Sequence, residues 1–372
     1  MEPASPEISV SSTGNSDVIR FGILGCAHIS RKNIRAMNML KDVEAYAVAS
    51  RSLAKAEAHA VATGMKPGSK CYGSYEELLE DPLVDVVYVP LPSGLHLEWV
   101  NKIAAKGKHV LLEKPVAMSI EEFDKMLEVC QQAGVQLMDG TMWMHNPRTS
   151  AMKSILKEKK AIGRPISVYA AFAAPLMNAD FLKNNVRMQK DLDGLGALGD
   201  LLWYCVRAVL WTMDYELPKE VRARPHTVFN DQGVIVQCGA DLFWENGTVS
   251  FVECSFNGGL RQTVEISGTT GLLTVMDFVL PSVETTSVFE IRRRSSNPHV
   301  YGHIVDIERH EVKTELPQEA LMVNQMAQLA RGLKNGTGVV DNHWPDIARK
   351  TQLVLNVIEE SIKAGAITVA VQ

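Results

Sequence analysis

Lys114, Asp200 and Tyr204 have the residue types and positions needed for proton transfer at a bound ligand. Lys114 follows an apolar run and precedes Pro115, and a residue before proline is kept out of the helical region. We therefore expect the lysine at the carboxyl end of a strand, the edge where ligands bind in open α/β sheets. Asp200 and Tyr204 are spaced i, i+4, which places both on one face of a predicted helix.

A tyrosine beside a lysine can act as a general acid and base. At ~4 Å and an effective dielectric constant of ~20, the charge of Lys114 is worth about 4 kcal/mol, or ~3 pKa units. This predicts a pKa for Tyr204 lowered from about 10 toward about 7. Asp200 is expected either to orient a substrate or to hold Lys114 protonated. The alternatives are structural: a salt bridge for Lys114, a core position for Tyr204 and a helix-start acid at Asp200.

The turn in "GILGCAHIS" follows the first predicted strand. A dinucleotide fingerprint has glycines at a G-x-G-x-x-G spacing, and this turn keeps only Gly25, with Ala27 and Ser30 at the other two positions. Because both substitutes are small, the helix N-terminus can still approach a pyrophosphate. We therefore assign Gly25, Ala27, His28 and Ile29 to cofactor binding, with a plain βα turn as the alternative.

The second predicted strand ends in "ASRS", which has no carboxylate. NAD-binding proteins place Asp or Glu there to bind the ribose 2′-hydroxyl. Ser50 and Arg51 instead suit a 2′-phosphate, because a guanidinium matches phosphate geometry and a carboxylate would repel it. The sequence thus predicts NADP as the cofactor. The alternative for Arg51 is a surface arginine at the start of a helix.

Residues 18–147 alternate apolar strands with helices, the pattern of a parallel sheet covered on both faces. This predicts an α/β fold that begins with a doubly wound, Rossmann-type NADP-binding domain. The expected strands are 18–24, 43–50, 84–90, 109–114 and 135–140. The expected helices are 28–40, 52–63, 75–80, 95–106 and 119–133.

From residue 148 the predicted strands follow one another, so we expect a C-terminal α+β domain with a large, open, mainly antiparallel sheet. We assign 148–343 to this substrate and oligomerisation domain, 1–17 to a disordered tail, and 344–372 to a C-terminal helix and tail that packs back on the Rossmann domain. The expected strands are 164–174, 233–245, 248–256, 261–268 and 271–278. The helices expected to cover one face are 199–212, 317–334 and 344–364.

The composition excludes several classes of partner. A length of 372 residues favours two domains. The formal net charge of −5, without a basic block, argues against nucleic acid and anionic membranes. No apolar run is long enough to span a bilayer. Six widely separated cysteines without a CxxC pair fit reduced thiols in the cytoplasm and predict no zinc site.

Four motifs resemble the glucose–fructose oxidoreductase/inositol dehydrogenase/MocA (Gfo/Idh/MocA) family of NAD(P)-dependent oxidoreductases: "GILGCAHIS", "YGSYEELLEDPLVDVVYVPLPSGLH", "LLEKP" and "GLGALGD". The resemblance covers nearly all of residues 18–365. Most members have histidine where this chain has Tyr204, and an Asp-x-x-x-Tyr arrangement is similar to the branch of dimeric dihydrodiol dehydrogenase and of uncharacterised plant oxidoreductases. The resemblance implies that Lys114, Asp200 and Tyr204 line the catalytic pocket and that the Lys114–Pro115 bond is cis. It also implies a set of residues that border the nicotinamide and its ribose: Leu91, Pro92, His96 and Glu113.

Together these observations predict an NADP-dependent oxidoreductase that transfers hydride between the nicotinamide and a carbinol or carbonyl carbon. The expected substrate is a small polyol, sugar, cyclic diol or related metabolite. The alternatives are a reductase of an alkene or imine, a redox-neutral NADP cycle, and a non-catalytic NADP-binding regulator. A metal site at His299 and His303 is disfavoured because Pro298 and Gly302 oppose a helix there.

The open sheet predicts self-association, because helices on one face leave the other face to solvent or to a partner. Val249 and Phe251 are expected on that face, with Ile235 and Phe243 on the neighbouring strand. The family resemblance, which implies pairing through this sheet, points the same way. We therefore expect a homodimer or a higher oligomer.

Overall fold

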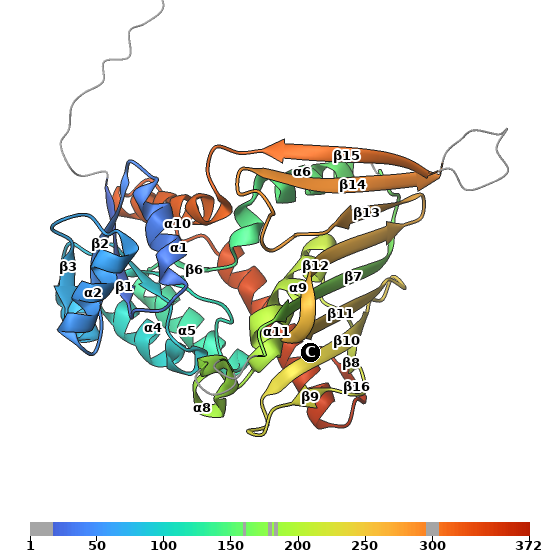
Figure 1. Cartoon of the computed structure of the whole chain (residues 1–372), viewed down its shortest axis with the longest axis horizontal. Coiled ribbons are helices and arrows are strands. Elements are labelled where there is room, and N and C mark those ends of the chain that lie inside the picture. The colour runs from blue at the N-terminus through green and yellow to red at the C-terminus, as the bar shows by residue number, and fades with distance from the viewer. Residues whose placement is uncertain (1–17, 159–160, 178–180, 182–184, 295–304) are drawn as a thin grey trace, which may run out of the picture.

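The computed structural model describes residues 18–158, 161–177, 181, 185–294 and 305–372. Within them the chain forms a six-stranded sheet, made by the first third of the sequence, and a ten-stranded sheet made by the remainder (Figure 1). The predicted fold class is therefore confirmed. The tail predicted at 1–17 lies outside the described residues.

The first sheet is parallel throughout and has the order β3-β2-β1-β4-β5-β6. Its central strands are mostly apolar, and their apolar residues are buried on both faces, as a sheet covered by helices on both sides requires. The order reverses between β1 and β4, which is the switch point of a doubly wound fold. The strands are β1 (Ile19–Leu24), β2 (Val43–Ala49), β3 (Lys70–Tyr72), β4 (Val86–Val89), β5 (His109–Leu112) and β6 (Leu137–Asp139).

The helices of this domain agree with the predicted ranges to within two residues at each end. They are α1 (Ser30–Asn38), α2 (Leu53–Thr63), α3 (Tyr75–Glu80), α4 (His96–Ala105) and α5 (Ile120–Ala133). Strand β3 was not predicted, because it is a three-residue edge strand without a buried residue. Serine side chains cap α3 and α5, where Ser74 accepts from the Glu77 amide and Ser119 from the Glu122 amide.

The second sheet has the order β15-β14-β13-β12-β7-β11-β10-β8-β16, and β9 pairs with β10. Every pairing is antiparallel except that of β7 with β11. The strands are β7 (Pro165–Pro175), β8 (Glu220–Ala223), β9 (Val228–Phe229), β10 (Ile235–Phe243), β11 (Val249–Ser255), β12 (Asn257–Gly268), β13 (Gly271–Val275), β14 (Thr286–Arg294), β15 (Val305–Lys313) and β16 (Thr368–Ala370). The prediction missed β8, β9, β15 and β16, which are short or carry many charged residues.

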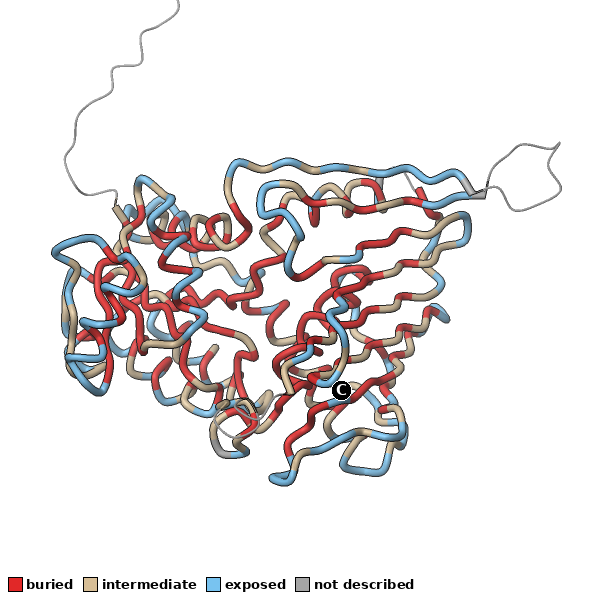
Figure 2. The backbone as a smooth tube through the Cα atoms, viewed as in Figure 1, coloured by how far each residue is buried: buried red, intermediate tan, exposed pale blue. Residues whose placement is uncertain are grey.

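Helices α6 (Pro147–Glu158), α9 (Trp203–Thr212) and α11 (His343–Lys363) pack against strands of this sheet. Helix α11 also contacts α5 and β6 and therefore joins the two sheets, whereas α10 (Gln318–Lys334) contacts α1 and β1 of the first domain. The last residues differ from the prediction, because β16 extends the second sheet instead of packing on the first domain. Figure 2 shows buried residues along the first sheet and through the centre of the molecule.

The sheet face expected to mediate self-association carries charges as well as apolar groups. Val249, Phe251 and Phe243 are half-buried there, as predicted, whereas Ile235 is only 4% exposed. The guanidinium of Arg224 lies 5.4 Å from the centre of the Phe251 ring. The expected apolar surface is therefore smaller than the sequence pattern suggested.

The predicted helix 199–212 begins with a π turn at Leu198–Leu202, and regular α-helix starts at Trp203. A side chain at Gly199 would bring its Cβ within 2.9 Å of Pro115 Cγ, so only glycine allows this close approach. The π turn therefore packs directly against the segment that carries Lys114. In the described part of the chain, we find no helix of the length and apolarity needed to cross a membrane.

Candidate active site

A cavity of about 780 Å³ lies between the two domains, at the carboxyl edge of the first sheet. Ligands bind at this edge in doubly wound folds. Most of the residues predicted to bind cofactor or substrate line it: Gly25, Ala27, His28, Ile29, Leu91, Pro92, Glu113, Lys114, Asp200 and Tyr204. The predicted residues outside its lining are Ser50, Arg51 and His96.

One end of the cavity is built by the turn between β1 and α1. Gly25 has a φ of 96°, a conformation that glycine adopts without strain. Among the described residues, the backbone N–H groups of Ala27, His28 and Ile29 have no hydrogen-bond acceptor. Unpaired N–H groups at the start of a helix attract anions. The turn therefore fits a pyrophosphate although two of the fingerprint glycines are missing.

Two cationic side chains, those of Arg51 and Lys55, follow the end of β2. Arg51 is exposed and has no ion-pair partner among the described residues, while Ser50 beside it is buried. The charge of Arg51 acts on the hydroxyl of Tyr75, which lines the cavity. Lys55, in the first turn of α2, lines the cavity directly. The sequence reasoning missed this second cation, since nothing local distinguishes it from other helix-surface lysines.

The Lys114 side chain is 8% exposed and points to the start of the π turn. Its Nζ donates to Asp200 Oδ1 at 2.6 Å and to the Asp200 carbonyl at 2.9 Å. The same Nζ lies 4.7 Å from the centre of the Tyr204 ring. The Lys114–Pro115 bond is cis, which confirms what the family resemblance implied. The salt bridge considered as the structural alternative is present, and it lies inside the cavity.

Arg187 is a member of this cluster that the sequence reasoning missed. It belongs to a single 3-10 turn, Val186–Met188, and its Nε lies 2.8 Å from Asp200 Oδ2. The carboxylate of Asp200 is thus held between two cations. No sequence motif marks Arg187, because its partner is thirteen positions away and the intervening segment has no regular repeat.

The charges of this cluster support one another. Burial alone would raise the pKa of Asp200, but Arg187 and Lys114 outweigh burial and hold that pKa at about 2. Burial lowers the pKa of Lys114, but Asp200 and Tyr204 raise it by more, so it lies above the usual value. Both groups are therefore charged at neutral pH. This geometry allows Asp200 to hold Lys114 protonated, and the other expected role, orienting a substrate, stays a prediction.

Tyr204 is 5% exposed, and its hydroxyl donates to Met142 Sδ at 3.7 Å. Burial raises its pKa to about 12, and the charge of Lys114 offsets only part of this increase. The expected lowering toward 7 is therefore wrong. The prediction from the sequence considered the lysine charge alone, whereas the structure buries the tyrosine, pairs that charge with Asp200 and places the Glu113 carboxyl nearby.

Glu113 forms the base of the cavity with two buried partners. The Tyr88 hydroxyl donates to Glu113 Oε1 at 2.6 Å and accepts from Asn33 Nδ2 at 2.6 Å. Burial raises the pKa of Glu113, which the hydrogen bond from Tyr88 partly offsets. The carboxyl group also packs against Gly140, where a side chain would bring its Cβ within 3.3 Å. Strands β4 and β5 thus fix the residue that precedes Lys114.

His96 has a different place from the one that the resemblance implied. It is 1% exposed, and its ring nitrogens face the carbonyl oxygens of Leu91 at 2.9 Å and Val116 at 3.0 Å. Burial lowers the pKa of His96. The ring joins the segments that follow β4 and β5 and does not border the cavity, so it supports the site indirectly.

No group of three His, Cys, Asp or Glu side chains in the described ranges is arranged to hold a metal ion. His299 and His303, the pair considered for a metal site, lie outside the described residues. The six cysteines are free, and the sulfurs of Cys238 and Cys254 share a hydrogen bond at 3.5 Å without forming a disulfide.

Comparisons with known proteins identify both domains as parts of one oxidoreductase family. Residues 19–141 match the family described as "Oxidoreductase family, NAD-binding Rossmann fold", and residues 150–274 match the "GFO/IDH/MocA C-terminal domain". The chain is 35% identical to D-xylose 1-dehydrogenase (NADP(+)) 2 of Haloferax volcanii, over 68% of this chain and 74% of that protein. It is 31% identical to trans-1,2-dihydrobenzene-1,2-diol dehydrogenase of Danio rerio, over 69% of this chain and 74% of that protein.

Solved structures show the same architecture. A 3-ketoreductase from Actinomadura kijaniata, crystallised with NADP and TDP-benzene, superposes with a TM-score of 0.77 at 25% identity. The superposition covers 92% of this chain and 98% of the ketoreductase.

Proposed function

Because the chain belongs to the Gfo/Idh/MocA family of oxidoreductases, we propose that it is an NADP-dependent enzyme that transfers hydride between the nicotinamide and a carbinol or carbonyl carbon. Sugar and diol dehydrogenases that use the same chemistry are among its relatives. The substrate is a small polyol, sugar, cyclic diol or related metabolite.

The observation that carries the proposal is the cluster of Lys114, Asp200, Arg187 and Tyr204 in a cavity beside a helix N-terminus with unpaired N–H groups. Residues suited to bind a dinucleotide and residues suited to transfer a proton therefore line the same cavity. A structural salt bridge alone would not need a tyrosine hydroxyl next to it or a cavity around it.

The residues of the first domain suit NADP. The N–H groups of Ala27, His28 and Ile29 would hold the pyrophosphate, and Arg51 with Lys55 would neutralise the 2′-phosphate. When bound, the reduced cofactor supplies the hydride. The protein orients the substrate and provides the proton.

Tyr204 is the residue that exchanges this proton with the substrate oxygen. With a pKa of about 12 it carries its proton at neutral pH, so it is ready to donate when a carbonyl is reduced. Lys114, kept charged by Asp200, stabilises the negative charge that develops on the substrate oxygen and on the tyrosine oxygen. In oxidation the tyrosine would have to lose its own proton before it could accept one from the substrate hydroxyl. Its high pKa opposes that loss at neutral pH.

Two other functions remain as alternatives. A reductase of an alkene or imine could use the same cavity, and analysis of the product formed with deuterated NADPH distinguishes it from carbonyl reduction. A non-catalytic NADP-binding regulator would need the turn after β1 but not the Lys114–Asp200–Tyr204 cluster, which is complete here.

We also propose that the protein works in the cytoplasm as a homo-oligomer. Six free cysteines fit a reducing compartment. Association through the second sheet would cover the half-buried Phe243, Val249 and Phe251. The ion pairs on the same face, such as Arg261 Nη1 to Glu253 Oε1 at 2.6 Å, would lie within or around that interface.

The test is Tyr204→Phe, which keeps the ring and removes only the hydroxyl. On a substrate identified by screening sugars, polyols, cyclic diols and carbonyl compounds for NADPH turnover, we expect a rate loss of about 10²–10⁴-fold. NADP affinity, measured by fluorescence titration, should remain, because the cofactor contacts lie in the first domain. Lys114→Met should also reduce turnover, and the double variant should be little worse than the poorer single variant.

Tyr215→Phe is a matched control. Its hydroxyl also donates to a methionine sulfur, Met144 Sδ, at 3.7 Å, but the residue lies outside this cavity. We expect the control to keep full turnover. Near-full turnover of Tyr204→Phe would refute the role given to the tyrosine. The proton would then have to be exchanged with Lys114, Asp200 or water.

A further inference from the structure

The segment between β13 and β14, Met276–Thr285 (the β13–β14 loop), forms part of the cavity wall through Val279 and Leu280. Leu280 is 37% exposed, and it shares the lining with Leu260 of β12 and Met322 of α10. None of these residues belongs to the Lys114 cluster. They form an apolar wall that comes from the second domain, the one expected to bind substrate.

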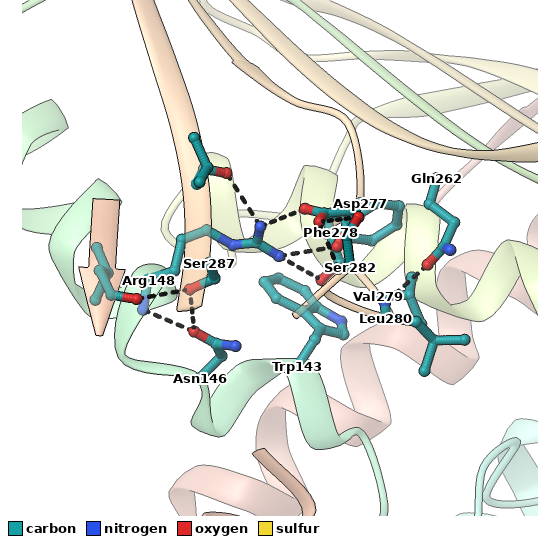
Figure 3. Close-up of polar contacts among 12 residues, drawn as sticks. Trp143, Asn146, Arg148, Gln262, Asp277, Phe278, Val279, Leu280, Ser282 and Ser287 are labelled. Carbon is teal, nitrogen blue, oxygen red and sulfur yellow. Dashed lines mark hydrogen bonds and ion pairs between the residues drawn. The ribbon is translucent and has the colours of Figure 1, made fainter. Parts of the chain in front are cut away.

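A buried arginine holds the start of this loop. Arg148, at the first turn of α6, is 2% exposed, and its guanidinium points at the loop (Figure 3). Nη1 donates to Asp277 Oδ1 at 2.5 Å and to the Val288 carbonyl at 3.1 Å. Nη2 donates to the carbonyls of Asp277 at 2.9 Å and Phe278 at 3.3 Å. Both terminal nitrogens are therefore committed to the loop and the strand that follows it.

Two buried glutamines hold the residues that face the cavity. The Leu280 amide donates to Gln262 Oε1 at 2.7 Å, and Gln318 Nε2 donates to the Val279 carbonyl at 2.7 Å. The carboxylate of Asp277 also accepts from the amide of Ser282 at 2.8 Å, which closes the loop on itself. Side chains from α6, β12 and α10 thus bind consecutive peptide groups of one surface loop.

The far end of the loop is tied to the first domain. Arg35 of α1 binds Glu284 through two hydrogen bonds, of 2.8 and 2.9 Å. The loop therefore bridges the two domains beside the cavity. Arg148 fixes the end that carries the wall, and Arg35 fixes the end that reaches α1.

We propose that Arg148 is a positioning residue that sets the place of the Val279–Leu280 wall and thereby determines which substrates the cavity accepts. A buried arginine is costly unless its charge is paired, and here Nη1 and Nη2 donate chiefly to loop carbonyls and to the loop's own carboxylate. A loop needed only to connect two strands would not require such a partner. The kinetic part of this inference rests on the proposed function, whereas the positioning part does not.

Hydrogen exchange tests the positioning without any substrate. In Arg148→Lys, which keeps the charge but not the planar array of donors, we expect amide exchange at Phe278, Leu280 and Ser282 to be ~10-fold faster or more. Phe123→Leu, a core substitution in α5 away from the cavity, is the control for general loss of stability. If Arg148→Lys lowers the melting temperature without a selective change in the loop, the residue is only structural and the proposal fails.

Kinetics tests the specificity on a substrate that the parent converts. We expect KM to rise ~10-fold in Arg148→Lys and in Leu280→Ala, with kcat nearly unchanged, as loss of an apolar pocket contact produces. Because both changes act on one wall, the double variant should resemble the poorer single variant. The proposal would be overturned if the KM increases of the two single variants multiplied in the double variant. It would also be overturned if NADP affinity fell by the same factor as KM rises. If the parent converts nothing, the proposed function fails while hydrogen exchange still decides the positioning role.

Discussion

Replacing Asp200 with asparagine removes the carboxylate that lies between Lys114 and Arg187. Lys114 Nζ is 2.6 Å from Asp200 Oδ1, and with an effective dielectric constant of ~20 this attraction is worth about 6 kcal/mol. The figure is an upper bound, because the asparagine oxygen still accepts a hydrogen bond. One pKa unit corresponds to about 1.4 kcal/mol, so losing even part of this attraction lowers the pKa of Lys114, because burial and the charge of Arg187 then act without the carboxylate.

The variant should reveal this loss in its pH dependence. Its rate of carbonyl reduction should begin to fall at a lower pH than the rate of the parent, because Lys114 loses its proton more readily when the carboxylate is gone. The pH dependence of stability should change as well, in the opposite direction to that of the rate. In the parent the pKa of Lys114 is raised on folding, so its stabilising effect is present below the unfolded pKa and is lost as pH rises through the folded value. In the variant the folded pKa is lowered, the unfolded chain binds more protons, and stability should rise with pH.

Rates and melting temperatures measured from about pH 6 to 10 check both expectations. Asp193→Asn is the control, because Asp193 lines the same cavity but accepts its hydrogen bond from Ser93 Oγ at 3.1 Å and forms no ion pair within the described residues. A parent-like pH profile and melting curve for Asp200→Asn would show that another group keeps Lys114 charged, and the reasoning would be refuted.

Two further predictions concern the cofactor and the assembly. Arg51→Ala should weaken NADP binding by ~1.5–3 kcal/mol and leave NAD binding nearly unchanged, as measured by titration; equal losses would contradict the assignment of Arg51 to the 2′-phosphate. Light scattering at micromolar concentration should show a homodimer or larger species, and Phe251→Glu on the open sheet face should shift it toward the monomer. A parent that scatters only as a 41.0 kDa particle would exclude the proposed oligomer.

Much of the fold could be predicted from local patterns. The apolar runs at β1, β4 and β5 are buried on both faces, and their alternation with helices identifies a parallel, doubly wound sheet. The glycine-rich approach to Asp200 and the proline after Lys114 mark both positions as unusual before any contact is known. These features depend on residues close together in the sequence, so the sequence alone reveals them. Strands such as β15, whose residues are mostly charged and exposed, lack that signal and were missed.

The protonation states and the supporting contacts of the site depend on tertiary structure. Lys114 and Asp200 are 86 positions apart, and Arg148 and Asp277 are 129 apart, so no local pattern relates them. The sequence predicted residue types suited to proton transfer, but it gave the wrong direction for the pKa of Tyr204. The pKa of a group depends on how much water it loses and on which charges surround it, and both are decided only when distant segments pack together.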